Sequence, residues 1–169
     1  ESDSALAAEY LRIIGDFERI ADHSVNILES AEEMQQKGIA FSAAALQEYA
    51  TMAGAVREVT ALAYDSFVSG DVQAARQVEP LEQVIDDLKE EMRTRHIRRM
   101  QQGSCGIEAG FIWSDLLTNL ERVSDHCSNI ACCMIEGADH NLHRHEVLQS
   151  IRGSGEIFDR EYSSYRQKY

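Results

Sequence analysis

The stretch DFERIADHSVNI at residues 16–27 returns as NLERVSDHCSNI at residues 119–130. Glu, Arg, Asp, His, Asn and Ile recur in the same register, and Ile20 is replaced conservatively by Val123. Agreement at that many positions indicates an internal duplication. Because the apolar residues of both copies recur with helical spacing, the two stretches predict two related helices.

The rest of the chain is also predicted to be helical. Glycines separate segments of about 30 residues with helical periodicity, and strand-type alternation is absent. The expected helices cover residues 5–36, 42–69, 71–102, 107–136 and, shorter, 144–168. Ser42 and Asp71 are favourable N-cap residues, and Pro80 should kink or restart the third helix. The fold class is therefore all-α, an antiparallel up-down bundle of four long helices plus a shorter C-terminal helix.

The first helix carries one broad apolar stripe, which we expect to face the core. The stripe consists of Tyr10, Ile13, Ile14, Phe17, Ile20, Ala21, Val25, Leu28 and Ala31.

Composition narrows the classes of function. The chain has 169 residues, with 16 Lys plus Arg against 29 Asp plus Glu, and a formal net charge of −13. Such an acidic chain lacks the basic surface that binds nucleic acid, and an anionic membrane would repel it. No apolar run reaches the roughly 18–20 residues of a membrane span, and the acidic N-terminus is unlike a signal peptide. We expect one domain over residues 1–169, cytoplasmic, with its four cysteines reduced.

The duplicated motif places oxygen atoms in a stripe. Glu18, Asp22 and Asn26 are spaced i, i+4 and i+8, so each lies only about 40° further around the helix than the last. The second copy repeats this spacing with Glu121, Asp125 and Asn129.

A third acidic pair, Glu82 and Asp86, lies near the middle of its own helix. Midpoints meet in an antiparallel bundle, so three helices are expected to bring six carboxylates to one level. Two such charges 4 Å apart repel by about 4 kcal/mol at an effective dielectric constant of 20. Protons, arginines or a metal must offset that repulsion. Oxygen ligands suit Fe, Mn, Ni or Zn, which makes a metal site the sharper hypothesis.

Simpler interpretations of the same residues stay open. Acidic stripes on helices are usually solvated, and Arg19 and Arg122 could neutralise them through i, i+3 pairs. His23 and His126 lie about 140° from the acids of their own motifs, which favours a core or surface position over a ligand.

Two further sets of residues have metal-binding chemistry. Cys132 projects on the same side of its helix as Glu121. The cluster of His140, His143 and His145 has the composition of a metal tract, but a polar loop explains it equally well. A ferritin-like di-iron centre is disfavoured because no histidine has a glutamate three residues before it.

The paired Glu-Arg-Ile/Val-x-Asp-His-x-x-Asn-Ile motif resembles the PhoU family of phosphate-uptake regulators. Residues 96–105, Gly110 with Phe111, and the end of the chain from His145 to Tyr169 resemble the PhoU-type cytosolic region of bacterial Na⁺/phosphate cotransporters. The resemblance implies two similar three-helix bundles and a regulator that is not an enzyme. It also implies a multinuclear cluster of Fe or Zn, with Ni or Mn as alternatives. The metal ligands that it implies are Glu18, Asp22, Glu82, Asp86, Glu121 and Asp125, with Asn26 and Asn129 as further oxygen donors.

The chain departs from the family pattern in two respects. Ala21 and Ser124 stand where the family has glycine before Asp-His. The chain also begins at what resembles the third helix of the first bundle, so we expect a single PhoU-like domain that is either truncated at its N-terminus or a shortened relative of the family.

Two functions of different classes follow. The first is a regulatory, metal-binding domain that controls phosphate uptake at the cytosolic face of the inner membrane. Its partner would be a phosphate transporter or an attached membrane domain, without insertion of this chain into the membrane. The second is a metal-free helical scaffold or homodimerisation module. A metal-dependent phosphohydrolase is a weaker third reading, because no nucleophile or substrate pocket is evident in the sequence.

Overall fold

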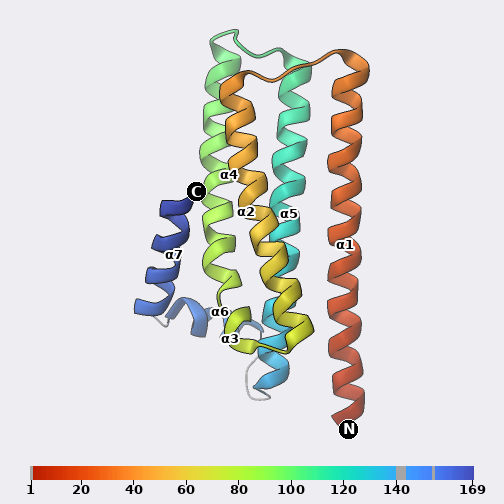
Figure 1. The fold of residues 1–169 in the computed structure, drawn as a ribbon, viewed down its shortest axis with the longest axis vertical. Coiled ribbons are helices and arrows are strands. Elements are labelled where there is room, and N and C mark those ends of the chain that lie inside the picture. The colour runs from red at the N-terminus through yellow and green to blue at the C-terminus, as the bar shows by residue number, and fades with distance from the viewer. Residues whose placement is uncertain (1, 140–143, 154) are drawn as a thin grey trace.

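The computed structural model describes residues 2–139, 144–153 and 155–169, and within them it forms α-helices without strands. The four long helices are α1 (Ser2–Lys37), α2 (Ala43–Ser69), α4 (Val78–Gln101) and α5 (Ile107–Ala138). The shorter ones are α3 (Val72–Ala75), α6 (Arg144–Gly153) and α7 (Glu156–Lys168). The long helices alternate in direction, which confirms the predicted all-α up-down bundle (Figure 1).

Local chemistry sets the breaks between these helices. Ser42 caps α2 by accepting a hydrogen bond from the Ala45 amide, and α2 ends at Gly70, whose φ of 67° is left-handed. Asp71 then caps α3 by accepting from two backbone amides. The predicted restart near Pro80 is confirmed, because α4 begins at Val78 and holds the proline in its first turn, where a missing N–H costs little.

The predicted single helix over residues 144–168 is wrong, because the chain forms α6 and α7 there. Gly155 precedes α7 with a φ of 40°, a conformation that favours glycine and breaks helical continuity.

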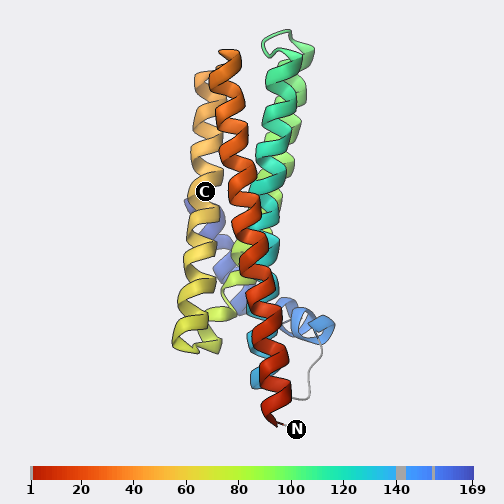
Figure 2. The ribbon, with the colours of Figure 1, turned by 90° about the vertical axis from the view of Figure 1, so that its right-hand side faces the viewer.

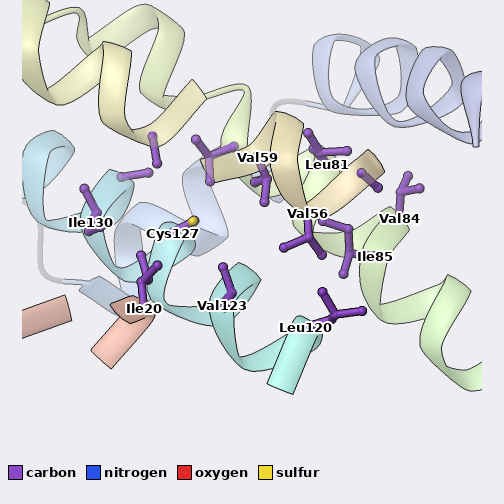
Figure 3. Close-up of a cluster of buried hydrophobic side chains, with 14 of the residues drawn as sticks. Ile20, Val56, Val59, Leu81, Val84, Ile85, Leu120, Val123, Cys127 and Ile130 are labelled. Atoms are coloured by element: carbon purple, nitrogen blue, oxygen red, sulfur yellow. The ribbon is translucent and has the colours of Figure 1, made fainter. Parts of the chain in front are cut away.

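The core lies between α2, α4 and α5, which pack against one another in pairs. Figure 3 shows Val59 of α2, Leu81 and Ile85 of α4, and Ile130 of α5 converging on the same space. All four are fully buried, as close packing of a three-helix core requires.

The remaining long helix, α1, packs chiefly along α5 (Figures 1 and 2). Its aromatic side chains also contact those of α2. The Phe17 ring lies 5.7 Å from that of Phe67. Burial on α1 is therefore one-sided: Ile13 and Ile20 are buried.

The expectation that the whole apolar stripe of α1 faces the core is wrong. Its exposed members are Tyr10, Ile14, Ala21, Val25, Leu28 and Ala31. A single neighbouring helix can cover only one side of a cylinder, so the rest of the stripe faces outward.

The C-terminal helix α7 lies against α4. The Tyr162 hydroxyl donates to Asp87, the Arg166 guanidinium pairs with Glu91, and the Lys168 ammonium lies 2.7 Å from Glu58 of α2. Each of these contacts joins the tail to an acid of the bundle.

All four cysteines are free, and three of them are buried. Across the described helices, none has the length and apolar character that a membrane crossing requires.

Candidate metal centre

Carboxylates from α4 and α5 converge near the middle of the bundle. Glu82, Asp86 and Asp125 each present one oxygen atom within 4.8 Å of the other two. The i, i+4 spacing puts Glu82 and Asp86 on one face of α4, and the same spacing puts Glu121 beside Asp125 on α5. Antiparallel packing of these helices then brings the two pairs together.

Glu82 is the most deeply placed of these acids, with 7% of its surface exposed. Its Oε2 atom has no hydrogen-bond partner among the described residues. Burial, followed by repulsion from Glu79 and Asp86, raises the pKa of Glu82 to about 9 from its usual 4.5. Without a metal, Glu82 is therefore protonated at neutral pH.

The neighbouring acids are shifted in the same direction. Burial raises the pKa of Asp86, and the negative charge of Glu121 raises it further. Burial, together with the charges of Glu121 and Asp86, raises the pKa of Asp125 to about 6. All three pKa values are raised first by burial and then by repulsion between the carboxylates, so full ionisation of the group is unfavourable.

The available cations compensate this cluster only in part. The Lys89 ammonium donates to Glu121 at 3.0 Å. Arg122 approaches Asp125 at 3.7 Å, but its side chain is 58% exposed, so solvent weakens the pairing. The predicted ion pair of Arg122 with an acid of its own helix is thus present, but it contributes little free energy.

A further buried acid, Glu79, borders the cluster and was not identified from the sequence. It is 3% exposed, accepts a 2.7 Å hydrogen bond from Ser128, and forms a 2.6 Å ion pair with Arg152 of α6. Its partners lie 49 and 73 residues away along the chain, so no local pattern signals them.

This donor set fits a hard or borderline cation. It supplies only carboxylate oxygens, it includes a buried acceptor that lacks a donor, and its acids resist ionisation while they stay unpaired. A bound divalent cation would satisfy the Glu82 oxygen and offset the repulsion within the cluster.

The equivalent acids of α1 do not join this group. Glu18 and Asp22 are exposed and lie outside the converging carboxylates. Their neighbours Asp16 and His23 contact His126 and Asn119 of α5, so the motif acids of both helices lie at the same level, but those of α1 do not converge with the others. The physical reason is the rotation of α1 about its own axis. His23 and Glu18 lie about 140° apart on the helix, and α1 turns the His23 side toward α5.

The duplicated His and Asn residues join α1 to α5 in matching pairs. The His126 Nδ1 atom lies 2.8 Å from the Asp16 carboxylate, and Asn129 donates to that same carboxylate at 3.1 Å. In the other copy, the side-chain oxygen of Asn119 lies 2.9 Å from His23 Nδ1 and accepts a 3.1 Å hydrogen bond from the Asn26 amide.

The two imidazoles stack with ring centroids 5.4 Å apart. Because Asp16 and Asn119 occupy equivalent positions of the motif, the repeat builds an interface with approximate two-fold symmetry. The amide nitrogens of Asn26 and Asn129 donate across this interface, so the nitrogen end of each side chain is turned toward the neighbouring helix.

The sequence also offers Cys132 and three histidines as candidate ligands. Cys132 is buried in the core and is 2% exposed. His140 and His143, and the side chain of His145, lie outside the described residues.

Comparisons with known proteins agree on one family. A family sequence model, described as the PhoU domain, matches residues 1–31 and 49–134. A Thermotoga maritima protein named phosphate-specific transport system accessory protein PhoU homolog 1 is 28% identical over 149 residues, which is 88% of this chain and 63% of that protein.

Two further relatives carry the same kind of name. The PhoU homolog of Deinococcus radiodurans is 26% identical over 132 residues, covering 76% of this chain and 59% of the relative. PhoU homolog 2 of T. maritima is 24% identical over 156 residues, covering 88% and 63%. The chain thus spans 59–63% of the length of these relatives. No solved structure matches it significantly.

Proposed function

Because the chain belongs to the PhoU domain family, we propose that it is a regulatory, metal-binding helical domain that controls phosphate uptake. The single observation that carries the metal-binding part is the group formed by Glu82, Asp86 and Asp125, with Glu121 beside it. A buried acceptor without a donor inside a carboxylate cluster is costly to fold unless a cation occupies the site.

The proposed partner is a phosphate transport system, because the matched relatives are named as accessory proteins of phosphate-specific transport. The resemblance of residues 96–105 and of the chain end to Na⁺/phosphate cotransporters supports a finer proposal. In it, this chain is the cytosolic part of such a cotransporter, working at the inner face of the bacterial inner membrane.

The proposed cofactor is a multinuclear site of Fe or Zn, with Ni or Mn as alternatives. Carboxylate oxygens of Glu82, Asp86, Glu121 and Asp125 would hold it, and the metal would supply positive charge to cancel their repulsion. The role of this chain's residues is conformational: loading removes the proton from Glu82 and stiffens the contact between α4 and α5.

The α1 acids fit the same scheme as a second, incomplete set. Glu18 and Asp22 occupy the motif positions of Glu121 and Asp125, and exposed apolar residues such as Ile14 flank them. We therefore treat residues 1–169 as a single PhoU-like domain in which α1 offers its outer face to further helices of a first bundle. A helix carrying an acidic i, i+4 pair, packed there as α4 packs on α5, would complete that set.

The direct test compares melting temperatures with and without metal. Elemental analysis of the purified protein identifies the metal, and chelator-treated protein then receives Zn²⁺ or Fe²⁺. We expect the melting temperature of the wild type to rise, and Glu121→Gln with Asp125→Asn to abolish that rise. The matched control is Glu18→Gln with Asp22→Asn, which alters the exposed copy of the same motif and should keep the rise. Absence of a metal-dependent rise in the wild type would overturn the metal-binding proposal.

Transport control needs its own measurement. Uptake of labelled phosphate is measured in membrane vesicles that contain the cognate transporter, in the presence and absence of this chain. We expect the chain to change the initial rate of uptake, and an unchanged rate contradicts the regulatory role.

The alternative function is a metal-free scaffold or dimerisation module. The observation that favours it is the outer face of α1, where Leu11 is 69% exposed and Leu28 is 58% exposed. Light scattering decides this alternative, because a partner-free monomer at all accessible concentrations contradicts it.

A further inference from the structure

A cavity of about 410 Å³ lies between the α3–α4 turn and the tail formed by α6 and α7. Arg76, Gln77 and Pro80 line it from the bundle side, whereas Phe158, Arg160 and Glu161 line it from α7. The bundle wall falls within the residues that match the PhoU domain, but the tail wall lies beyond residue 134, where that match ends. The cavity is therefore built jointly by the family domain and the segment that follows it.

Arg76 is the first feature that indicates a ligand. Its side chain is partly buried, yet among the described residues it has no ion-pair or hydrogen-bond partner. The chain carries 29 acids, and its other partly buried arginine in the bundle, Arg99, holds Glu48 through two hydrogen bonds. A half-buried guanidinium without a counter-ion is costly, and an anion in the cavity would supply its missing partner.

The opposite wall supplies the second feature. Phe158 and Ile157 line the cavity from α7, and Pro80 adds apolar surface from the bundle side, so the lining also suits a flat, weakly polar group. The volume lies within the range of about 300–1,000 Å³ that is usual for small-molecule sites. Inorganic phosphate would fill only the arginine end and leave the apolar wall unused.

Two polar pairs also line the cavity. Glu161, whose carboxylate lies 2.9 Å from the largely exposed Arg160 side chain, can accept from hydroxyl groups. Gln73 and Gln77 are spaced i, i+4, and both line the cavity with amides that can donate and accept. The lining therefore offers partners for an anion, hydroxyl groups and a ring, which are the parts of a nucleotide.

We propose that this cavity binds a nucleoside monophosphate. Arg76, with Arg160, holds the phosphate, Glu161 accepts from the ribose hydroxyls, and the base packs on Phe158. Since the two walls belong to α3–α4 and to α7, the ligand also fastens the tail to the bundle. This site is separate from the carboxylate cluster and does not depend on metal binding there.

The test is calorimetric titration of the whole chain with AMP at physiological ionic strength, with adenosine and inorganic phosphate as separate arms. We expect AMP to bind at least tenfold more tightly than either fragment. Arg76→Gln, which keeps length and hydrogen bonding but removes the charge, should weaken AMP binding at least tenfold. Phe158→Leu, which keeps apolar packing but removes the ring, should weaken it severalfold.

Arg57→Gln is the matched control. Arg57 is an exposed arginine of α2 that lies outside this cavity and has no pairing partner among the described residues, so AMP binding should be unchanged. Circular dichroism checks that each variant is folded, and hydrogen exchange of residues 156–168 should slow when AMP is added to the wild type. The proposal is overturned if AMP does not bind, if adenosine or phosphate binds as tightly as AMP, or if Arg57→Gln weakens binding as much as Arg76→Gln.

Discussion

The two copies of the repeated motif have nearly the same sequence but different surroundings. In α5, the motif has α4 on one side and α1 on the other, and its acids join Glu82 and Asp86. In α1, the same motif touches α5 on one side, and Glu18 and Asp22 are exposed. Identical spacing thus yields a candidate metal site only where a second acidic helix covers the acids. Substitutions at equivalent positions of the two copies, and at an acid that lies beside only one of them, measure this difference.

The largest contrast is expected at the last residue of the motif. Ile130 is fully buried in α5, whereas its equivalent Ile27 is only partly buried in α1. Ile130→Ala should lower the free energy of unfolding by about 4 kcal/mol, and Ile27→Ala by about 1 kcal/mol, because the cavity left in a closed core cannot collapse. Urea denaturation measures both, and equal losses would show that α1 is as enclosed as α5.

The next contrast concerns the polar pairs between α1 and α5. Asp16 is 8% exposed and accepts from His126 and Asn129, whereas Asn119 at the equivalent position is only partly buried. Asp16→Ala should cost about 3 kcal/mol because it leaves two donors unmet, and Asn119→Ala should cost about 1 kcal/mol. The same denaturation series checks the order, and a larger loss for Asn119→Ala would contradict the assigned roles.

The acids of the cluster should make the metal-free protein sensitive to pH. The pKa of Glu82 in the folded protein, about 9, lies above its usual 4.5, so the folded state binds more protons than the unfolded state between these values. Stability should therefore fall as pH rises from about 4.5 to 9. Glu82→Gln removes this loss, so it should stabilise the metal-free protein clearly at pH 8 and much less near pH 5.

The control for that pH series is Glu18→Gln on α1, which should leave the profile unchanged. Added metal should flatten the profile of the wild type, because the cation takes the place of the proton. A profile that stays flat in the metal-free wild type would contradict the assigned protonation of Glu82.

The smallest effect is expected on the outer face of α1. Leu28 is 58% exposed, while its equivalent Ala131 is 4% exposed. Leu28→Ser should change stability by less than about 0.5 kcal/mol, and Ala131→Ser should cost about 1 kcal/mol by burying a hydroxyl group. Thermal melts at two protein concentrations check both, and a large, concentration-dependent loss in Leu28→Ser would indicate that another copy covers α1 in solution.

Much of the fold could be predicted from local sequence patterns. Helical periodicity placed three of the long helices within three residues of their observed ends, whereas the expected helix over residues 71–102 divides into α3 and α4. The caps at Ser42 and Asp71 are present, and Pro80 marks a restart. These features depend on neighbours in the chain, which the sequence displays directly. The break before α7 was not predicted, because the backbone conformation of Gly155, with its φ of 40°, is not visible in the helical periodicity.

In the candidate site, too, only the features that depend on neighbours in the chain could be predicted. The acidic pairs are visible as i, i+4 spacing, but Glu79 was missed because Ser128 and Arg152 reach it from distant helices. The histidines were correctly separated from the acids by their angle on the helix, although the wheel could not tell which side α1 would turn toward α5.

The sequence by itself determined that this chain is all-α, that it is duplicated, and that it belongs with the PhoU domain, since periodicity and motif are properties of residues near one another along the chain. The tertiary structure alone decided which copy of the motif gathers carboxylates. It also decided that the His and Asn residues fasten α1 to α5, and that the tail closes a cavity against α3 and α4. Helix rotation and pairing set these outcomes, and both follow from how much apolar surface each neighbour buries, which no single stretch of sequence records.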